Sequence, residues 1–146
     1  MTIFFPTASK YKDKTPIFNK INKFIPYVFL LGIPTFFLSE LIILKLYGTN
    51  YHVDLLLILL FAITAILFSC YSAYGWLFNS EGERGIQVTL SGTVAIGFSN
   101  IVLNIYLIPV YGLHGAIIST LLAYCIGIFV LYHFKNNVIA NNSKVK

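Results

Sequence analysis

The chain has 146 residues, of which 58% are hydrophobic and only 10% are charged, and its mean hydropathy is +0.80. A soluble domain is about a quarter charged, and one small core cannot hide this surplus of apolar side chains from water, so a soluble globular protein is excluded. The 13 Phe and 10 Tyr exclude a disordered chain as well. The net charge of +5 does not indicate nucleic-acid binding, because the basic residues flank hydrophobic runs, where they orient a protein in a membrane.

Four hydrophobic runs follow a basic amino-terminal segment. They cover Phe24–Leu46, Leu55–Phe78, Ile86–Ile108 and Gly112–Phe134. Each run is about 23 residues long and as a helix rises about 35 Å, enough to cross a hydrocarbon layer of about 30 Å. The runs lack the period-two alternation of barrel strands. We therefore predict an all-α integral membrane bundle in one domain, with four transmembrane helices over 24–134. An amino-terminal stub over 1–23 holds a basic segment, and a tail covers 135–146.

The lysines and arginines predict the orientation of these helices. With four spans, nine of them fall on one side of the membrane: Lys10, Lys12, Lys14, Lys20, Lys23, Arg84, Lys135, Lys144 and Lys146. Only Lys45 falls on the other side. Because cytoplasmic loops carry the excess of basic residues, both termini are expected in the cytoplasm. Arg84 serves this orientation, and it is also a candidate for contact with an anionic lipid head group.

The third run carries a stripe of polar and small residues. Its members follow at steps of four, four, three and four, which places them on one helical face: Thr89, Thr93, Gly97, Asn100 and Asn104. One interpretation is the hydrophilic wall of a substrate cavity. The other is hydrogen bonding between helices, at about 0.6 kcal/mol per pair. The sequence leaves both open.

The fourth run carries small residues at similar spacing: Gly112, Ala116, Ser119 or Thr120, Ala123 and Gly127. Such spacing lets two helix backbones approach closely, so we expect this stripe to serve packing. Tyr124 lies beside it, and its hydroxyl either enters a cavity or belongs to a packed aromatic side chain.

Glu40 is the one acidic residue well inside a run, roughly 12 Å from the end at Gly48 by helical rise. An intramembrane carboxylate is a candidate for a proton or cation relay, and the alternative is a helix end that water reaches. Cys70 and Cys125 lie inside apolar runs and are expected to be small, buried hydrophobic residues. The chain has no Ser/His/Asp set, HExxH motif, phosphate-binding loop or paired carboxylates, so we expect neither an enzyme nor a cofactor.

The end of the third run and the start of the fourth resemble a known family. The pattern is Asn100-x3-Asn104, then Ile108-Pro109, then Gly112-x2-Gly115-Ala116, followed by Thr120 and Tyr124. It is similar to the late helices of bacterial polysaccharide flippases, the O-antigen and capsule repeat-unit (Wzx-type) transporters of the multidrug, oligosaccharidyl-lipid and polysaccharide exporter superfamily. Further similar segments are Leu31–Pro34, Leu46–Gly48, Ile3–Pro6 and Ser9–Tyr11.

The resemblance implies that the chain is the carboxy-terminal portion of a larger, MATE-like transporter fold in the bacterial cytoplasmic (inner) membrane. It also implies that the stub over 1–23 includes the end of a preceding helix. Such transporters move undecaprenyl-diphosphate-linked oligosaccharides across that membrane for lipopolysaccharide or capsule synthesis. The implied partners are membrane lipid, the lipid-linked oligosaccharide, and the missing amino-terminal helices or another polysaccharide-assembly protein. Basic residues of the central cavity are implied to hold the diphosphate, and since this chain has no Lys or Arg in mid-span, other helices would supply them.

On this resemblance, the candidates for contact with sugar hydroxyls are Thr93, Asn100, Asn104 and Tyr124, and Glu40 is the candidate for ion coupling. Two alternatives stay open. One is a self-sufficient four-helix small transporter that acts as a dimer, for which an acid in the first helix is suited. The other is an accessory subunit or an inactive fragment that does not transport.

Overall fold

The computed structural model describes residues 15–47 and 54–139; the expectations for residues 1–14 and 140–146 lie outside them. Within the described residues the chain forms four α-helices: α2 (Thr15–Tyr47), α3 (Leu55–Asn79), α4 (Glu83–Tyr111) and α5 (Leu113–Ile139). All four are long and apolar enough to cross a membrane. Within the described residues the predicted all-α class is confirmed, with four helices able to span a membrane, and these four helices indicate a multi-pass membrane protein.

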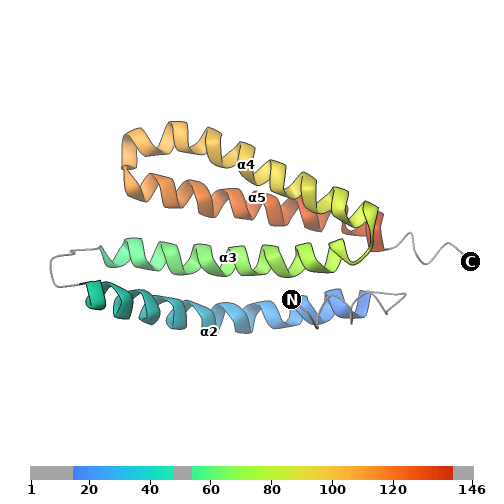
Figure 1. Cartoon of the computed structure of the whole chain (residues 1–146), viewed down its shortest axis with the longest axis horizontal. Coiled ribbons are helices and arrows are strands. Elements are labelled where there is room, and N and C mark those ends of the chain that lie inside the picture. Colours follow the sequence, from blue (N-terminus) through green and yellow to red (C-terminus); the bar gives the residue numbers. More distant parts are fainter. Residues whose placement is uncertain (1–14, 48–53, 140–146) are drawn as a thin grey trace, which may run out of the picture.

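The helices lie side by side, with α3 between α2 and α5, and α4 packed on α5 (Figure 1). The start of α2, the turn from α3 to α4 and the end of α5 share one end of the bundle, which we call end 1. The end of α2, the start of α3 and the turn from α4 to α5 share the opposite end, which we call end 2. By their positions in the helices, Lys20, Lys23, Arg84 and Lys135 lie toward end 1, and Lys45 lies at end 2.

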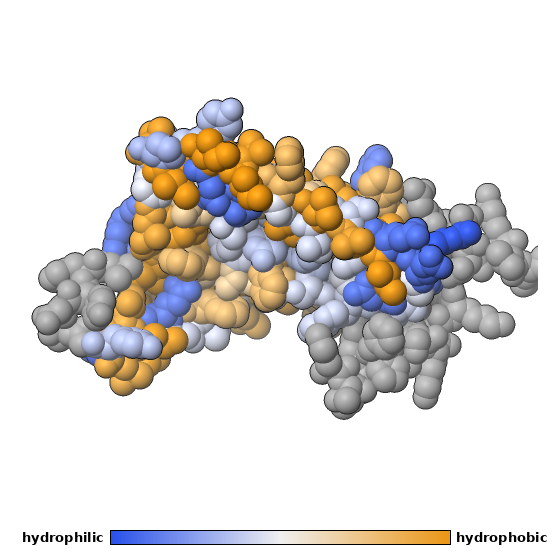
Figure 2. All heavy atoms as spheres, turned by 45° about the horizontal axis from the view of Figure 1, so that its top comes forward, coloured by the Kyte–Doolittle hydropathy of each residue, from blue (hydrophilic) through white to orange (hydrophobic). Residues whose placement is uncertain are grey.

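The outer helices expose large hydrophobic side chains along their length. Leu30 on α2 and Phe98 on α4 are both 71% exposed, a state that lipid or neighbouring membrane helices make favourable for so many residues. Figure 2 shows orange, hydrophobic residues over much of the bundle, with the largest group of blue, hydrophilic residues toward the right-hand end and smaller groups elsewhere. The apolar belt and the polar end agree with helices that lie across a bilayer.

The first helix begins at Thr15, earlier than the predicted Phe24. Proline suits the first turn of a helix, and Pro16 stands there. The first turns of α2 also pack against α3 through Phe18, which is 4% exposed. Its ring centroid lies 5.4 Å from that of Tyr74 and 6.5 Å from that of Phe78. At 33 residues α2 is about 50 Å long, more than a hydrocarbon layer needs, so its first turns reach beyond that layer.

The turn between α4 and α5 depends on two glycines. The third run was expected to stop at Pro109, but α4 continues to Tyr111 and ends where Gly112 adopts a φ of +55°. Gly112 therefore makes a turn and does not belong to the packing stripe. At Gly115 a β-carbon would lie 2.2 Å from the carbonyl oxygen of Leu107, so only glycine lets α5 start this close to α4.

The rest of the small-residue stripe packs α5 into the bundle, as predicted. Ser119 and Ala123 are fully buried, and a β-carbon at Gly127 would lie 2.4 Å from Cγ1 of Ile96 on α4. In lipid the hydrophobic effect does not drive helices together, so the van der Waals contacts that small residues permit are what hold α5 in the bundle.

An aromatic cluster closes end 1. Phe18 of α2 contacts Tyr132 of α5, with ring centroids 6.2 Å apart, and the Nζ of Lys135 lies 3.8 Å from the Tyr132 centroid and 5.3 Å from that of Phe18. The Tyr74 hydroxyl donates a hydrogen bond to the side-chain oxygen of Asn22. These contacts join α2, α3 and α5 at the end that carries most of the described basic residues.

Candidate functional site

A row of hydrogen-bonded side chains runs between α3, α4 and α5, and we call it the polar seam. It is built on the predicted face of α4 and has these members: Tyr71, Thr89, Thr93, Asn100, Asn104 and Thr120. Within it, the structure joins three of the four predicted substrate-contact residues to neighbouring helices or to one another.

The asparagine part of the seam is a directional chain. The Nδ2 of Asn104 donates to the Oδ1 of Asn100 at 2.7 Å, and the Nδ2 of Asn100 donates to the Oγ1 of Thr120 at 3.0 Å. The Thr120 hydroxyl donates in turn to the carbonyl of Ala116 at 2.9 Å. At the other end the buried Oδ1 of Asn104 has no partner among the described residues. The chain thus ends in a free hydrogen-bond acceptor within an apolar bundle.

The threonine part of the seam connects α4 to α3. The Tyr71 hydroxyl donates to the carbonyl of Thr89 at 3.1 Å and lies 2.9 Å from the Oγ1 of Thr93. The Thr93 hydroxyl also donates to the Thr89 carbonyl, at 3.0 Å. A β-carbon at Gly92 would lie 3.0 Å from the Tyr71 hydroxyl, so the tyrosine lies directly against the α4 backbone.

Tyr124 packs beside the polar seam but takes no part in its hydrogen bonds. Its ring meets Phe68 edge-on at 5.8 Å between centroids and Tyr71 at 6.1 Å. In the described part of the chain its hydroxyl has no hydrogen bond, and the side chain is half-buried. The phenol ring is therefore held by aromatic contacts, while its polar end is free to bind.

Space remains along the middle of the α4 face. Gly97 lies between Thr93 and Asn100 on the same stripe, it is exposed, and a β-carbon there would meet nothing within 4 Å. The asparagine chain borders this open backbone and does not lie in a closed core.

The two charged candidates lie away from the seam. Glu40 is half-buried on α2, which packs mainly against α3, and in residues 15–47 and 54–139 it has no hydrogen bond or ion pair. Arg84 is exposed in the first turn of α4 at end 1. The structure therefore does not bring Glu40 or Arg84 together with the four candidate substrate-contact residues.

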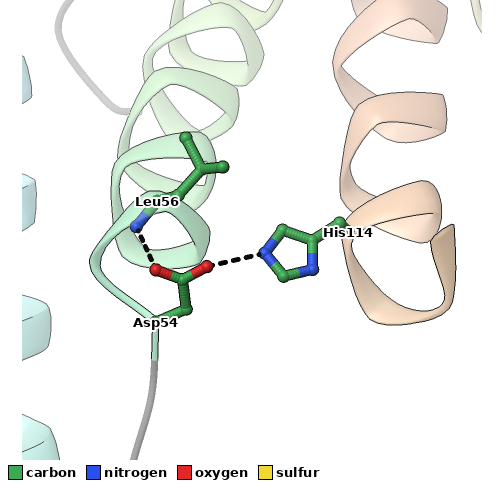
Figure 3. Close-up of polar contacts among 3 residues, drawn as sticks. All are labelled: Asp54, Leu56 and His114. Atoms are coloured by element: carbon green, nitrogen blue, oxygen red, sulfur yellow. Dashed lines mark hydrogen bonds and ion pairs between the residues drawn. The ribbon is translucent and has the colours of Figure 1, made fainter.

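A polar pair at end 2 was not predicted. The Nε2 of His114, at the start of α5, lies 3.1 Å from the Oδ2 of Asp54, and the Oδ1 of Asp54 accepts from the backbone N–H of Leu56 at 3.1 Å (Figure 3). These hydrogen bonds, first that from Leu56 and then that from His114, lower the pKa of the Asp54 carboxyl below its usual 3.8. The predicted four-span topology could have indicated this pair, because it places Asp54 and His114 at the same membrane face.

Tyr71 and Thr120 were also missed as seam members. Tyr71 is a polar residue in an apolar run, and Thr120 belongs to a packing stripe, so both could have been suspected of hydrogen bonding. No spacing rule, however, predicts which residues of different helices meet. Cys70 is buried as expected, whereas Cys125 is exposed. Among the described residues no group of three His, Cys, Asp or Glu side chains is placed to hold a metal ion.

Comparison of the chain with protein-family models, with curated proteins and with solved structures gave no significant match.

The Tyr71 contact has a measurable consequence. Tyr71→Phe is expected to lower the free energy of unfolding by about 0.6 to 1 kcal/mol, because the link from α3 to Thr89 and Thr93 is lost while the ring stays packed. Unfolding of the purified protein in mixed micelles of increasing SDS content measures this. Tyr106→Phe is the matched control, since Tyr106 is 70% exposed on α4. Equal losses in the two variants would contradict the assigned contact.

Proposed function

We propose that the chain is the carboxy-terminal part of a lipid-linked oligosaccharide flippase with a MATE-like fold. It would translocate undecaprenyl-diphosphate-linked repeat units across the bacterial cytoplasmic membrane for surface polysaccharide synthesis. The amino-terminal helices of the transporter, or another polysaccharide-assembly protein, would complete the transport pathway.

The observation that carries this proposal is the asparagine chain on α4 and α5. The residues of the family-like pattern, Asn100, Asn104 and Thr120, are those that hydrogen-bond to one another inside an apolar bundle. Polar groups at membrane depth are costly unless they face a neighbour or a water-filled path, and in transporters such groups mark the path of the substrate. The buried Oδ1 of Asn104 has no partner in the described residues, so it could accept a hydrogen bond from a substrate if a neighbouring helix moved aside.

Sugar hydroxyls fit this chemistry. An amide offers a donor and an acceptor, and a sugar hydroxyl can exchange with either group without a change of charge. Thr93, Asn100, Asn104 and Tyr124 are the proposed contacts, with the Tyr124 hydroxyl free to join. The diphosphate would be held by basic groups outside this chain, and Arg84 would contact lipid head groups at end 1 and anchor the topology.

The proposed orientation places end 1 in the cytoplasm. Four of the described basic residues lie toward that end, against Lys45 at end 2, and an excess of Lys and Arg characterises cytoplasmic loops. With four spans, both termini are then cytoplasmic.

A second candidate function is favoured by Glu40. A half-buried carboxylate without a partner in the described chain would take up a proton or a cation at membrane depth. Such a group is suited to a self-sufficient, ion-coupled small transporter that acts as a dimer. In the flippase, the same residue would couple transport to an ion gradient.

Deletion of the gene from its own bacterium tests the proposal. We expect surface polysaccharide to be lost and undecaprenyl-diphosphate-linked oligosaccharide to accumulate, as measured by polysaccharide immunoblot and lipid extraction. Re-expression of the complete wild-type gene should reverse both effects. An unchanged lipid-linked pool and unchanged surface polysaccharide would refute the flippase.

Glu40→Gln separates the two candidates. If the chain is a small ion-coupled transporter, crosslinking should capture a discrete dimer, and export of its small substrate should fail in this variant while polysaccharide is unaffected. The exposed Ser39 is the matched control, because its hydroxyl bonds only to its own helix at the Thr35 carbonyl, so Ser39→Ala should behave as wild type in both assays.

A further inference from the structure

Asp54 and His114 join the starts of two neighbouring helices. Asp54 is the amino-terminal cap of α3, and His114 is the second residue of α5, sixty positions later in the chain. In Figure 3 the Asp54 carboxylate lies between α3 and α5, with one oxygen toward the Leu56 N–H and the other toward the His114 imidazole. One side chain thus both caps α3 and fastens it to α5 at end 2.

Few charged or titratable side chains besides this pair are described toward end 2. They are Glu40, Lys45 and Tyr47 on α2 and Tyr106 and Tyr111 on α4. In the described part of the chain, none of these five forms an ion pair or hydrogen bond with Asp54 or His114. The side chains of His114 and Asp54 are 36% and 56% exposed, so protons reach both from water.

The two partners differ in their acid–base chemistry. The carboxylate of Asp54 is stabilised by the Leu56 N–H and by the amino-terminal end of the helix, so it remains charged down to acid pH. Histidine is the side chain whose charge ordinarily changes between pH 5 and 8. A neutral imidazole gives the carboxylate one hydrogen bond, and a protonated imidazole adds the attraction of opposite charges.

We propose that Asp54 and His114 form a proton-controlled latch that holds the starts of α3 and α5 together more tightly when His114 is protonated. The latch does not depend on the transported substrate. In the proposed orientation end 2 faces outward, so the latch would respond to the pH outside the cell. Movement of α3 against α5 at that end, which opening toward the outside would require, would then be easier at neutral than at mildly acid pH.

Hydrogen exchange on the purified full chain in nanodiscs tests the latch. The amides in the first turns of α3 and α5 are compared at about pH 5.5 and about pH 8, after correction for the intrinsic exchange rate. We expect their protection to be about two- to fivefold greater at the lower pH, the range for a solvent-exposed ion pair. His114→Gln keeps a hydrogen-bond donor but cannot titrate, so its protection should not change between the two pH values.

Two further variants complete the test. Asp54→Asn keeps a good helix cap but removes the charge, so it should preserve α3 and abolish the pH dependence. His133→Gln, at the other end of α5, should retain the wild-type pH dependence. The latch is refuted if wild-type protection is the same at both pH values, or if either His114→Gln or Asp54→Asn retains the full change.

Discussion

Replacing Gly85 with alanine is expected to lower the free energy of unfolding by about 3 kcal/mol. Gly85 is buried in the first turn of α4, and a β-carbon there would lie 1.7 Å from the backbone carbonyl oxygen of Phe78 and 2.6 Å from its carbonyl carbon. Backbone atoms cannot rotate away as a flexible side-chain end can. Because Phe78 is itself fully buried, α4 must move away from the end of α3 to make room.

The matched control for Gly85→Ala is Gly97→Ala on the same helix. A β-carbon at Gly97 meets nothing within 4 Å, so this variant should be neutral or stabilised by up to about 1 kcal/mol through the better helix propensity of alanine. SDS-driven unfolding followed by circular dichroism measures both. Similar stabilities for the two variants would contradict the close contact between α3 and α4 at end 1.

Replacing both Asn100 and Asn104 with leucine is expected to reduce transport about 30-fold in the functional transporter. Each asparagine is proposed to give the substrate one hydrogen bond of about 1 kcal/mol, and a loss of about 2 kcal/mol is a factor of about 30. Lipid-linked oligosaccharide reaching the outer leaflet is the quantity to measure, with membrane abundance of the variant determined in parallel.

The hydrogen bonds of the polar seam indicate that the double variant should fold, so that its loss of transport can be distinguished from misfolding. In the double variant no polar group is orphaned, because the Thr120 hydroxyl keeps its bond to the Ala116 carbonyl and the unpaired Oδ1 of Asn104 is gone. Asn100→Leu alone instead leaves the Asn104 side chain without its acceptor, so it should be less stable than the double variant. Wild-type transport by a stable double variant would remove both asparagines from the substrate path.

Ser91→Leu is the control for loss of a polar group from α4. Ser91 is exposed, and its hydroxyl bonds only to the Gln87 carbonyl of its own helix, so neither transport nor stability should fall. A loss of transport equal to that of the double asparagine variant would mean that the effect arises from hydropathy of α4 and not from its seam.

The α4 stripe illustrates how far sequence reasoning reached into the candidate site. Spacing alone placed Thr93, Asn100 and Asn104 on one helical face, and these residues do lie along the seam. Spacing left open whether that face meets another helix or a cavity. The structure shows hydrogen bonds to Thr120 and Tyr71 on neighbouring helices, together with a free acceptor at Asn104. The hydrogen-bonding interpretation is therefore observed at these atoms, and the substrate-cavity interpretation stays a prediction.

The helix boundaries were less predictable than the spans. Hydrophobicity marks the part of a helix that lies in lipid, so it missed the turns of α2 before Phe24, which are polar on one side and packed through Phe18 on the other. It also stopped α4 at Pro109, although the helix continues past this proline and the chain turns only at Gly112. The Asp54–His114 pair was not predicted from the sequence, because no local pattern connects residues sixty positions apart.

Composition and run length by themselves determined that this chain is a helical membrane protein with four spans, because a continuous apolar stretch in lipid must satisfy its backbone hydrogen bonds within the helix. The tertiary structure alone decided which polar atoms find partners, which glycines admit a neighbouring backbone, and that α3 and α5 are tied together at end 2. Those outcomes depend on how faces of different helices meet, and small residues and single hydrogen bonds decide that meeting, because lipid supplies no hydrophobic drive of its own between helices.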